Sequence, residues 1–401
     1  MPGRLVTSQS QFDTLCDKAR EAGVVAFDTE FVSESYFRPR LCLIQLATTE
    51  LEAVIDPFEI EDLSKWWEVM RDPDVTVIVH GGREEIRFCM HLGGGRPQQL
   101  VDVQIAEGLL SRGFPLGFQM LVPRVTGKRI QGSETRTDWQ RRPLTSRQID
   151  YALEDVRYLI EIWGRQQQAL SEKDRVDWAW AEFERLIDDV EGEAARNTWR
   201  RLPGIHRLSR RQMAVARELY QWRAEVAESL NRPVRSMLRD DLLIEISTRR
   251  PRSLNDLNRT RGMHRREYQR MAGDILAAVE RAMALPEDEL PEKPRPPQNP
   301  PQEDVLSKVL GLALANRCNE LGLSTNIVGT MNDLQELVRW HMVNGDPNSE
   351  PLPRLMQGWR GRVCGDLLTD LLKGRYSIRI ADVLSETPLA FEAVDGYSAE
   401  D

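Results

Sequence analysis

The sequence predicts an α/β protein in which a mixed β-sheet with flanking helices is followed by two small all-α units. Three observations lead to this fold class. Residues 1–195 alternate apolar, strand-like runs with segments of helical periodicity. Residues 208–286 and 303–382 show helical periodicity only. Between them, residues 287–302 form a charged, proline-rich linker, and residues 383–401 form a weakly patterned acidic tail.

The amino-terminal unit contains the patterns of a sheet and its covering helices. An apolar run predicts a strand over 24–31, and two further runs joined by a tight polar turn predict an antiparallel meander over 41–48 and 51–56. The next segments predict a helix over 62–72, a strand over 75–80 and a helix over 83–92. A strongly amphipathic segment then predicts a helix over 145–163 that is capped by Thr145 or Ser146.

The composition is that of a globular protein of the reducing cytoplasm. Hydrophobic residues make up 41% of the 401 residues and charged residues 29%. No apolar run approaches the roughly 20 residues that span a membrane, and the first residues contain no apolar signal region. The five cysteines are scattered and lack any CxxC spacing, so we expect neither a zinc site nor a disulfide framework. These features predict a cytoplasmic location and no contact with a membrane.

The net charge of -9 hides an uneven distribution of charge along the chain. By segment, residues 1–195 carry about -11, residues 196–285 about +10, and residues 286–401 about -8. The middle segment is basic almost wholly through arginine. It is either the solvated face of a helical domain or a contact surface for a polyanion.

Carboxylates gather at the end of the predicted strand 24–31. Side chains alternate along a strand, so Asp28 and Glu30 point to the same face, where they repel each other and burial penalises both charges. Tyr151 and Asp155 are four residues apart and share one face of the predicted helix 145–163. Asp155 alone would be an ordinary exposed carboxylate, but three converging carboxylates form a site for Mg²⁺ or Mn²⁺, which would neutralise the repulsion. Two such ions about 3.5–4 Å apart can activate a water molecule and stabilise the leaving oxygen in phosphodiester cleavage.

These motifs resemble those of a known nuclease family. VVAFDTEF resembles the first motif of the DEDD 3′→5′ exonucleases, and YALEDVRYL resembles the third motif of their tyrosine-bearing branch. The run SETRTDWQRRPLTSRQIDYALEDV is similar to a run typical of the ribonuclease D family. Two later stretches, one beginning LSRRQMAVARELYQWRAEVAESLNRP and one beginning LMQGWRGRVCGDLLTDLL, resemble helicase-and-RNase-D C-terminal (HRDC) domains, the second more weakly. The resemblance covers nearly the whole chain and implies a ribonuclease H-like catalytic domain over 1–195, an HRDC domain over 208–286 and a divergent HRDC-like domain over 303–382.

The resemblance also implies roles for single residues. Asp28, Glu30 and Asp155 would hold the main divalent ion, Asp28 would bridge to a second ion, and Tyr151 would orient or help to deprotonate the attacking water. Phe31 would wedge against terminal bases, although a plain core role is equally consistent with the pattern. The local charge of the basic segment, and not the resemblance, makes seven arginines the expected RNA contacts: Arg232, Arg235, Arg239, Arg259, Arg261, Arg265 and Arg266.

One position departs from the family pattern. The second motif of the family places an aspartate on the helix after His80, where this chain has Glu85, or Glu84 if the motif is shifted by one residue. Glutamate keeps the charge, but the extra methylene alters the reach of the carboxylate that would support the second ion. Both glutamates could instead face solvent at the start of the helix.

The resemblance therefore implies a metal-dependent 3′→5′ exoribonuclease that releases nucleoside 5′-monophosphates from RNA ends, with tRNA precursors as a plausible substrate and no obligate protein partner. Two alternatives stay open. The chain could be a non-catalytic or weakly active RNA-binding protein on a decayed nuclease scaffold, which only Glu85 favours. It could also be a DNA 3′→5′ exonuclease, because the contacts to the 2′-hydroxyl that distinguish RNA from DNA cannot be identified in the sequence.

Overall fold

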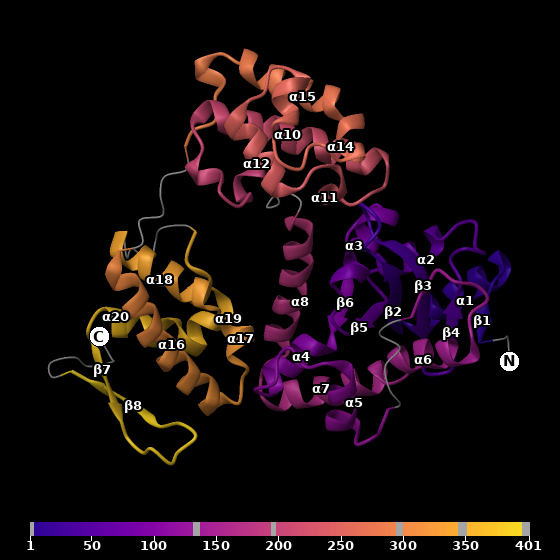
Figure 1. The fold of residues 1–401 in the computed structure, drawn as a ribbon. Helices are drawn as coiled ribbons and strands as arrows, with labels where there is room; N and C mark the ends of the chain where they lie inside the picture. The colour runs from indigo at the N-terminus through magenta and orange to yellow at the C-terminus, as the bar shows by residue number, and fades with distance from the viewer. Residues whose placement is uncertain (1–3, 131–136, 194–197, 294–299, 344–350, 395–401) are drawn as a thin grey trace.

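The chain folds into three lobes, which lie at the corners of a triangle in Figure 1. The computed structural model describes residues 4–130, 137–193, 198–293, 300–343 and 351–394. In these residues, no helix has both the length and the apolar character needed to cross a membrane. The first lobe contains the sheet, and the second and third are mainly helical, in agreement with the predicted fold class.

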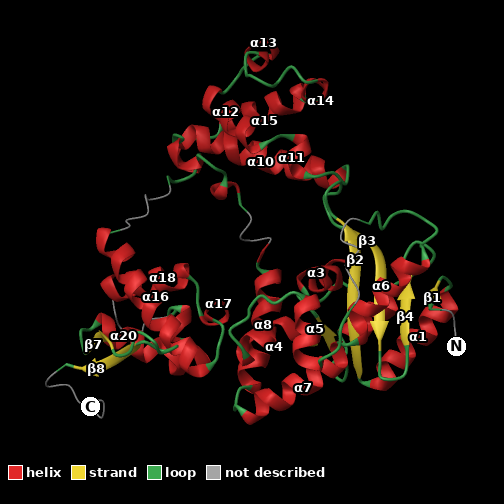
Figure 2. Ribbon diagram, turned by 60° about the horizontal axis from the view of Figure 1, so that its bottom comes forward, coloured by secondary structure: helices red, strands yellow, loops and turns green. Residues whose placement is uncertain are grey.

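The sheet of the first lobe has six strands in the order β1-β4-β3-β2-β5-β6. All six are labelled in Figure 1, and Figure 2 shows β1, β4, β3 and β2 side by side. The two central hairpin contacts, β2 with β3 and β3 with β4, are antiparallel, whereas the remaining neighbours are parallel, so the predicted mixed sheet is confirmed. The short edge strands β1 and β6 were not predicted. The strands are β1 (Leu5–Val6), β2 (Val24–Val32), β3 (Arg40–Ala47), β4 (Glu52–Ile55), β5 (Thr76–Val79) and β6 (Gln99–Asp102).

Helices cover both faces of this sheet. Phe27 of β2 packs on Trp66 of α2 with ring centroids 4.8 Å apart, whereas Leu43 of β3 packs with Ala152 and Leu153 of α6 on the opposite face. The predicted helix 145–163 is divided at Tyr158, which ends α6 and begins α7. The helices are α1 (Gln9–Ala22), α2 (Ser64–Met70), α3 (Arg83–Leu92), α4 (Val103–Leu110), α5 (Phe118–Thr126), α6 (Ser146–Arg157), α7 (Leu159–Glu172) and α8 (Val176–Glu191).

The second lobe has a hydrophobic core of its own. Leu202 and Leu290 are buried in this core, so the packed unit is wider than the predicted range 208–286, and the first residues of the predicted linker belong to it. Its long helices, α10 and α15, pack on each other. The elements are the short 3₁₀ turns Trp199–Arg201, Ile205–Arg207 and Glu287–Glu289, and the helices α10 (Arg210–Ser229), α11 (Val234–Met237), α12 (Asp240–Arg249), α13 (Leu254–Asn258), α14 (Arg266–Arg270) and α15 (Ala272–Ala284).

The third lobe differs from the prediction of an all-α unit followed by an unpatterned tail. Strands β7 (Tyr376–Ile380) and β8 (Leu389–Ala393) form an antiparallel hairpin. Asn316 fastens this hairpin to a helix, since its Oδ1 accepts a hydrogen bond from Leu389 N at 3.0 Å. The hairpin depends on a contact with a residue far away in the chain, and local sequence patterns do not record such contacts. The helices are α16 (Pro301–Leu321), α17 (Thr325–Val328), α18 (Met331–Val343), α19 (Gly358–Arg360) and α20 (Asp366–Leu372), with a 3₁₀ turn at Arg354–Met356 and a π turn at Gly361–Gly365; residues 395–401 lie outside the described part of the chain.

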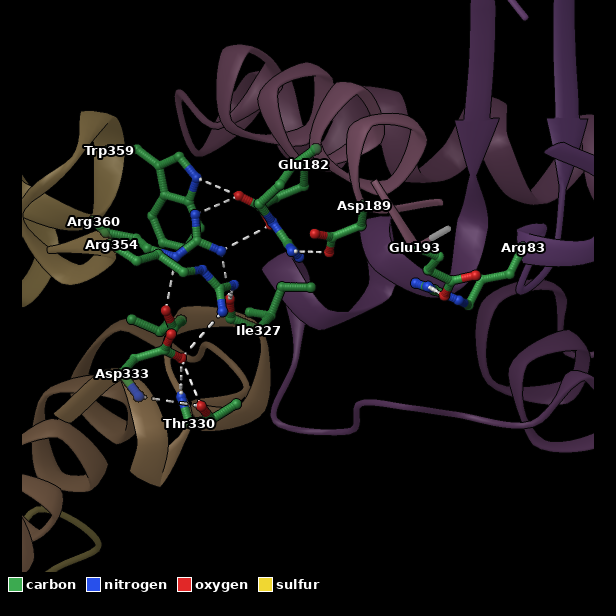
Figure 3. Close-up of polar contacts among 12 residues, drawn as sticks. Arg83, Glu182, Asp189, Glu193, Ile327, Thr330, Asp333, Arg354, Trp359 and Arg360 are labelled. Carbon is green, nitrogen blue, oxygen red and sulfur yellow. Dashed lines mark hydrogen bonds and ion pairs between the residues drawn. The ribbon is translucent and has the colours of Figure 1, made fainter. Parts of the chain in front are cut away.

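The third lobe is docked on α8 of the first lobe through buried side chains (Figure 3). Glu182 accepts hydrogen bonds from Arg360 Nη2 at 2.8 Å and from Trp359 Nε1 at 3.0 Å, and its side chain is 1% exposed. Beside this pair, Trp178 and Trp359 stack with ring centroids 5.0 Å apart. The cores of the two lobes form one continuous hydrophobic cluster, whereas the core of the second lobe is separate.

Candidate active site

Strand β2 places two carboxylates on one face of the sheet. Asp28 is opposite Gln45 of β3 in the antiparallel register, and Glu30 is opposite Leu43. Because alternate residues of a strand share a face, both carboxylates point to the side that α6 covers, while Phe27 enters the core on the other side. The register shifts between Glu30 and Phe31, which marks a bulge directly after the two acids.

Helix α6 brings Tyr151 and Asp155 to the same face. The helix begins with a capping box, in which Thr145 accepts a hydrogen bond from Gln148 N at 3.2 Å and the Gln148 side chain accepts one from Thr145 N at 2.8 Å. This cap confirms Thr145 rather than Ser146 as the start. Ala152 and Leu153 then pack against β3 and β4, so the next turn of the helix lies beside β2. Tyr151 and Asp155 are joined there by a side-chain hydrogen bond.

Helix α3 contributes Glu85, because β5 is shorter than β2. Strand β5 pairs only with Val24–Ala26, so the part of β2 that carries the acids has a free edge, and α3 starts beside it. Asp102 fixes this start: its carboxylate accepts hydrogen bonds from Gly81 N at 3.0 Å and Gly82 N at 3.1 Å. Gly81 adopts φ 70°, which favours glycine, at the sharp turn into the helix.

The structure distinguishes the two candidate residues on α3. The side chain of Glu85 is buried, and its Oε1 accepts a hydrogen bond from the Thr29 hydroxyl at 2.6 Å. Glu84 instead forms an ion pair with Arg87. The expectation that both glutamates could face solvent is therefore wrong for Glu85, which lies beside the carboxylates of β2.

Burial raises the pKa of each acid in this cluster, and repulsion between members of the cluster adds to the shift for Asp28 and Glu30. For Asp28, burial and then the charges of Glu85, Asp155 and Glu30 raise the pKa well above its usual range. Burial, together with Asp155 and Glu85, raises the pKa of Glu30 to about 8. Burial raises the pKa of Glu85 to about 7 against the opposing hydrogen bond from Thr29. It also raises the pKa of Asp155 to about 7, although the hydrogen bond from Tyr151 lowers it.

The cluster fits divalent cations by its chemistry. All four acidic side chains offer hard carboxylate oxygens, and ionising them together in a buried site calls for a counter-charge. Gln45 is fully buried and lies opposite Asp28, and its amide group has no hydrogen-bond partner in the described part of the chain. An unpaired donor and an unpaired acceptor are therefore available next to the acids. Across the described residues, no three His, Cys, Asp or Glu side chains are gathered closely enough to hold an ion as they stand.

The predicted RNA contacts lie outside this cluster. Phe31 is half-buried, and its ring meets the ring of Phe88 on α3 edge-on at 5.8 Å, so the packing leaves both of its predicted roles open. All seven predicted arginines of the second lobe are exposed. Arg239 pairs with Asp241 at 2.9 Å, and Arg235 and Arg259 lie 3.9 Å from acidic partners.

Two polar residues near the acids, Thr29 and Gln45, were missed at the level of sequence. Thr29 lies between the two strand acids but points to the other face, where it holds Glu85. Gln45 interrupts the apolar strand RLCLIQLA, which was the available signal. Arg142 ties the loop before α6 to the sheet, since its Nη2 donates to Asp56 Oδ1 at 2.7 Å and to Cys42 O at 2.9 Å.

Comparison with known proteins shows the family to which this architecture belongs. A 3′-5′ exonuclease domain family matches residues 4–170, and the HRDC domain family matches residues 212–279. Ribonuclease D of Escherichia coli (strain K12) is 31% identical over 374 residues, which are 92% of this chain and 98% of that protein. Ribonuclease D of Bartonella henselae is 29% identical over 385 residues, 94% of this chain and 92% of that protein.

The folds agree as well as the sequences. The crystal structure of E. coli RNase D, described as an exoribonuclease involved in structured RNA processing, superposes with a TM-score of 0.83 at 30% identity and covers 93% of this chain and 99% of that one. The similarity extends over the sheet domain and both helical lobes, and it confirms the resemblance first suggested by the motifs around Asp28 and Asp155. The chain therefore belongs to the ribonuclease D family of 3′-5′ exoribonucleases.

Proposed function

We propose that the protein hydrolyses RNA from its 3′ end in a reaction that depends on divalent metal ions and releases nucleoside 5′-monophosphates. The observation that carries this proposal is the convergence of four carboxylates from three elements, β2, α3 and α6, in one buried cluster. Ionising these acids together calls for a counter-charge, which bound divalent cations would supply in the arrangement that phosphodiester hydrolysis uses.

Each residue of the cluster has a role in this proposal. Asp28, Glu30 and Asp155 would hold the first ion, and Asp28 and Glu85 would hold the second. When bound, Mg²⁺ or Mn²⁺ ions supply activation of the attacking water and stabilisation of the leaving oxygen. The Tyr151 hydroxyl donates a hydrogen bond to the Asp155 carboxylate and would keep it oriented; from the same position it would orient the water. Thr29 holds Glu85 at the free edge of β2.

The substrate that we propose is structured RNA, including tRNA precursors, in the cytoplasm. The related E. coli enzyme is described as taking part in structured RNA processing. The second lobe supports a nucleic-acid substrate, because it carries exposed arginines on an otherwise acidic chain. All five cysteines are buried free thiols, which suits a reducing compartment.

A second candidate function is RNA binding without catalysis, and Glu85 is the observation that favours it. The longer side chain and its 2.6 Å hydrogen bond from Thr29 could keep the carboxylate from an ion. In that case the protein would bind RNA ends but not shorten them.

The test is a cleavage assay with 5′-labelled and 3′-labelled RNA and DNA in Mg²⁺, Mn²⁺ or EDTA. The wild type should shorten RNA from the 3′ end only when metal is present, and Asp28→Asn and Asp155→Asn should each abolish cleavage without unfolding the protein. Asp150→Asn is a matched control, because Asp150 lies on α6 next to Tyr151 but is exposed and pairs with Arg4. Near-wild-type cleavage by Asp28→Asn would overturn the assignment, and binding without cleavage by the wild type would favour the second candidate.

A further inference from the structure

A groove of about 540 Å³ lies where the first lobe meets the second. The loop between β2 and β3 forms one wall, with Tyr36, Phe37 and Arg38. The carboxyl-terminal half of α3 lies along the groove, and the end of α10 supplies Glu228 and Asn231 on the far side.

This groove is separated from the acidic cluster by one layer of aromatic side chains. Phe88, which lines the groove, lies on α3 one turn after Glu85. Its ring meets that of Phe31, the residue directly after Glu30. The groove is therefore placed to receive whatever extends from a substrate whose end lies at Asp28, Glu30 and Glu85.

The lining has the chemistry of a site for single-stranded nucleic acid. Tyr36 and Phe37 are half-buried and therefore keep ring surface open, on which bases of any identity can stack. Arg38 and Arg40 line the same wall and are exposed, as phosphate contacts need to be. Arg232 is also exposed and directly follows the lining residue Asn231 in the chain.

The acidic side chain in the lining is already paired with a cation. Glu228 forms an ion pair with Arg38, and both side chains are about half exposed, so a phosphate can compete with the carboxylate for the guanidinium. Nη1 of Arg38 also lies 2.6 Å from a ring nitrogen of His91, which holds the arginine over the groove.

We propose that this groove binds the nucleotides on the 5′ side of the one being removed, with bases against Tyr36 and Phe37 and a phosphate on Arg38 in place of Glu228. The proposal rests on the proposed exoribonuclease activity, and it assigns to these residues the task of gripping a single-stranded 3′ end several nucleotides long. A substrate too short to leave the acidic cluster would not use the groove.

Two variants with opposite expected effects test this binding site. In an Asp28→Asn background, the dissociation constant of a 5′-fluorescein-labelled hexaribonucleotide should rise about tenfold with Phe37→Ala or Arg38→Ala. It should fall about two- to fivefold with Glu228→Gln, because the competing carboxylate charge is gone. Arg20→Ala is the control, since Arg20 is similarly exposed and pairs with Asp72 far from the groove. This control should leave the constant unchanged.

The opposite expected changes in the dissociation constant distinguish RNA binding from an ion pair that only holds the two lobes together. If the Arg38–Glu228 pair only holds the two lobes together, Arg38→Ala and Glu228→Gln should weaken binding alike, which would overturn the proposal, as would unchanged affinity in all variants. In the catalytically active background, Arg38→Ala should lower kcat/KM for the hexanucleotide about tenfold and leave that for a dinucleotide unchanged. Absence of cleavage by the wild type would refute the proposed function alone, because the binding experiment does not depend on cleavage.

Discussion

At the scale of single residues, the site depends on carboxylates held close together at a cost in free energy. Asp28 and Glu30 share a face of β2, and Asp155 and Glu85 reach them from two helices. Each carboxylate would ionise more readily alone in water than it does here. The electrostatic strain of this cluster should therefore be measurable in the protein without metal.

Stability in metal-free buffer should fall as the pH rises from about 5 to about 8. The pKa of Glu30 is raised from 4.5 to about 8 and that of Asp155 to about 7, so the folded protein binds more protons than the unfolded chain in this window. Deprotonation then favours the unfolded chain, and stability is lost with increasing pH. The measurement is the melting temperature in EDTA across this range, compared with that of Glu30→Gln.

The variant isolates the cluster from the other titrating groups. Glu30→Gln should melt at a higher temperature than the wild type at pH 8, and the two should converge near pH 5. Added Mg²⁺ should narrow the difference, because a cation compensates the ionised acids. Parallel melting curves for the two proteins at all pH values would show that Glu30 is not electrostatically strained.

Glu85 should be essential through its charge but tolerant of a shorter side chain. We expect Glu85→Asp to keep or raise cleavage activity, since aspartate is the family residue at this position, and Glu85→Gln to lower kcat about 100-fold or more. Glu84→Gln is the control, because Glu84 pairs with Arg87 and should matter little. Full activity of Glu85→Gln would remove Glu85 from the site, and activity gained only in Glu85→Asp would favour the decayed scaffold.

At the scale of secondary-structure elements, the lengths of neighbouring strands determine where Glu85 lies, and the packing of α8 determines where the third lobe docks. β2 extends beyond its partner β5, and the free edge that results is where α3 delivers Glu85. On the other side of the domain, α8 carries the surface on which the third lobe docks. Arg83 of α3 pairs with Glu193 just beyond α8, so the same helices connect the site with the docking surface (Figure 3).

The docking surface should depend on the pair Glu182–Arg360. Arg360→Met leaves the carboxylate of Glu182 buried with less compensation and should destabilise the protein by about 3–5 kcal/mol. The double variant Glu182→Gln with Arg360→Met should recover much of that loss, because the buried carboxylate charge, which Arg185 alone would then compensate, is gone. The unfolding free energies of both variants can be measured by tryptophan fluorescence during urea denaturation, since Trp178 and Trp359 stack at the same surface.

An exposed ion pair in the same lobe provides the comparison. Arg379 pairs with Glu392 across the hairpin, with both side chains about half exposed. Arg379→Met should leave the urea midpoint unchanged, as is usual for surface pairs. Equal effects of Arg360→Met and Arg379→Met would mean that burial of the Glu182 pair contributes nothing to docking.

At the scale of the whole molecule, the first and third lobes share a continuous core, whereas the second has its own. The second lobe is also where the positive charge of the chain is concentrated, about +10 over residues 196–285. Its ion pair with the first lobe, Arg38–Glu228, lies at the groove proposed to bind RNA. Charge and position together support the proposal that this lobe supplies the electrostatic part of RNA binding.

The exposed arginines of the second lobe should set the salt dependence of binding. We expect neutralising four of them at once to make the slope of log affinity against log salt shallower by about 3, at roughly 0.7 per phosphate contact of a single strand. The arginines are Arg232, Arg261, Arg265 and Arg266. The measurement is fluorescence anisotropy of labelled RNA with Asp28→Asn protein over a series of KCl concentrations.

The control is the removal of arginine charge elsewhere on the protein. Arg20 and Arg157 of the first lobe pair with Asp72 and Glu52, and replacing both should leave the slope unchanged. If the quadruple variant also kept the wild-type slope, the basic face would be solvated surface, and the sheet domain would hold the RNA without it.

The sequence by itself determined the local parts of this protein. Alternation along 24–31 put Asp28 and Glu30 on one face, and helical spacing put Tyr151 and Asp155 on another, because both periodicities are properties of the backbone. The start of the helix at Thr145 or Ser146 and the mixed sheet followed from equally local signals, and the structure then identified Thr145 as the cap. The concentration of arginine in the second lobe was found by counting charged residues in the sequence.

Only the tertiary structure decided the parts that depend on distant residues. The resemblance favoured Glu85 over Glu84, but only the structure shows that Glu85 is buried against Thr29 whereas Glu84 pairs with Arg87. No pattern near residue 85 records that β5 stops short of the end of β2, where α3 begins. The hairpin β7–β8 and the pair Glu182–Arg360 depend on partners far away in the chain. Such contacts form when folding brings buried surfaces together, so the free energy that selects them belongs to the assembled core and not to any single segment.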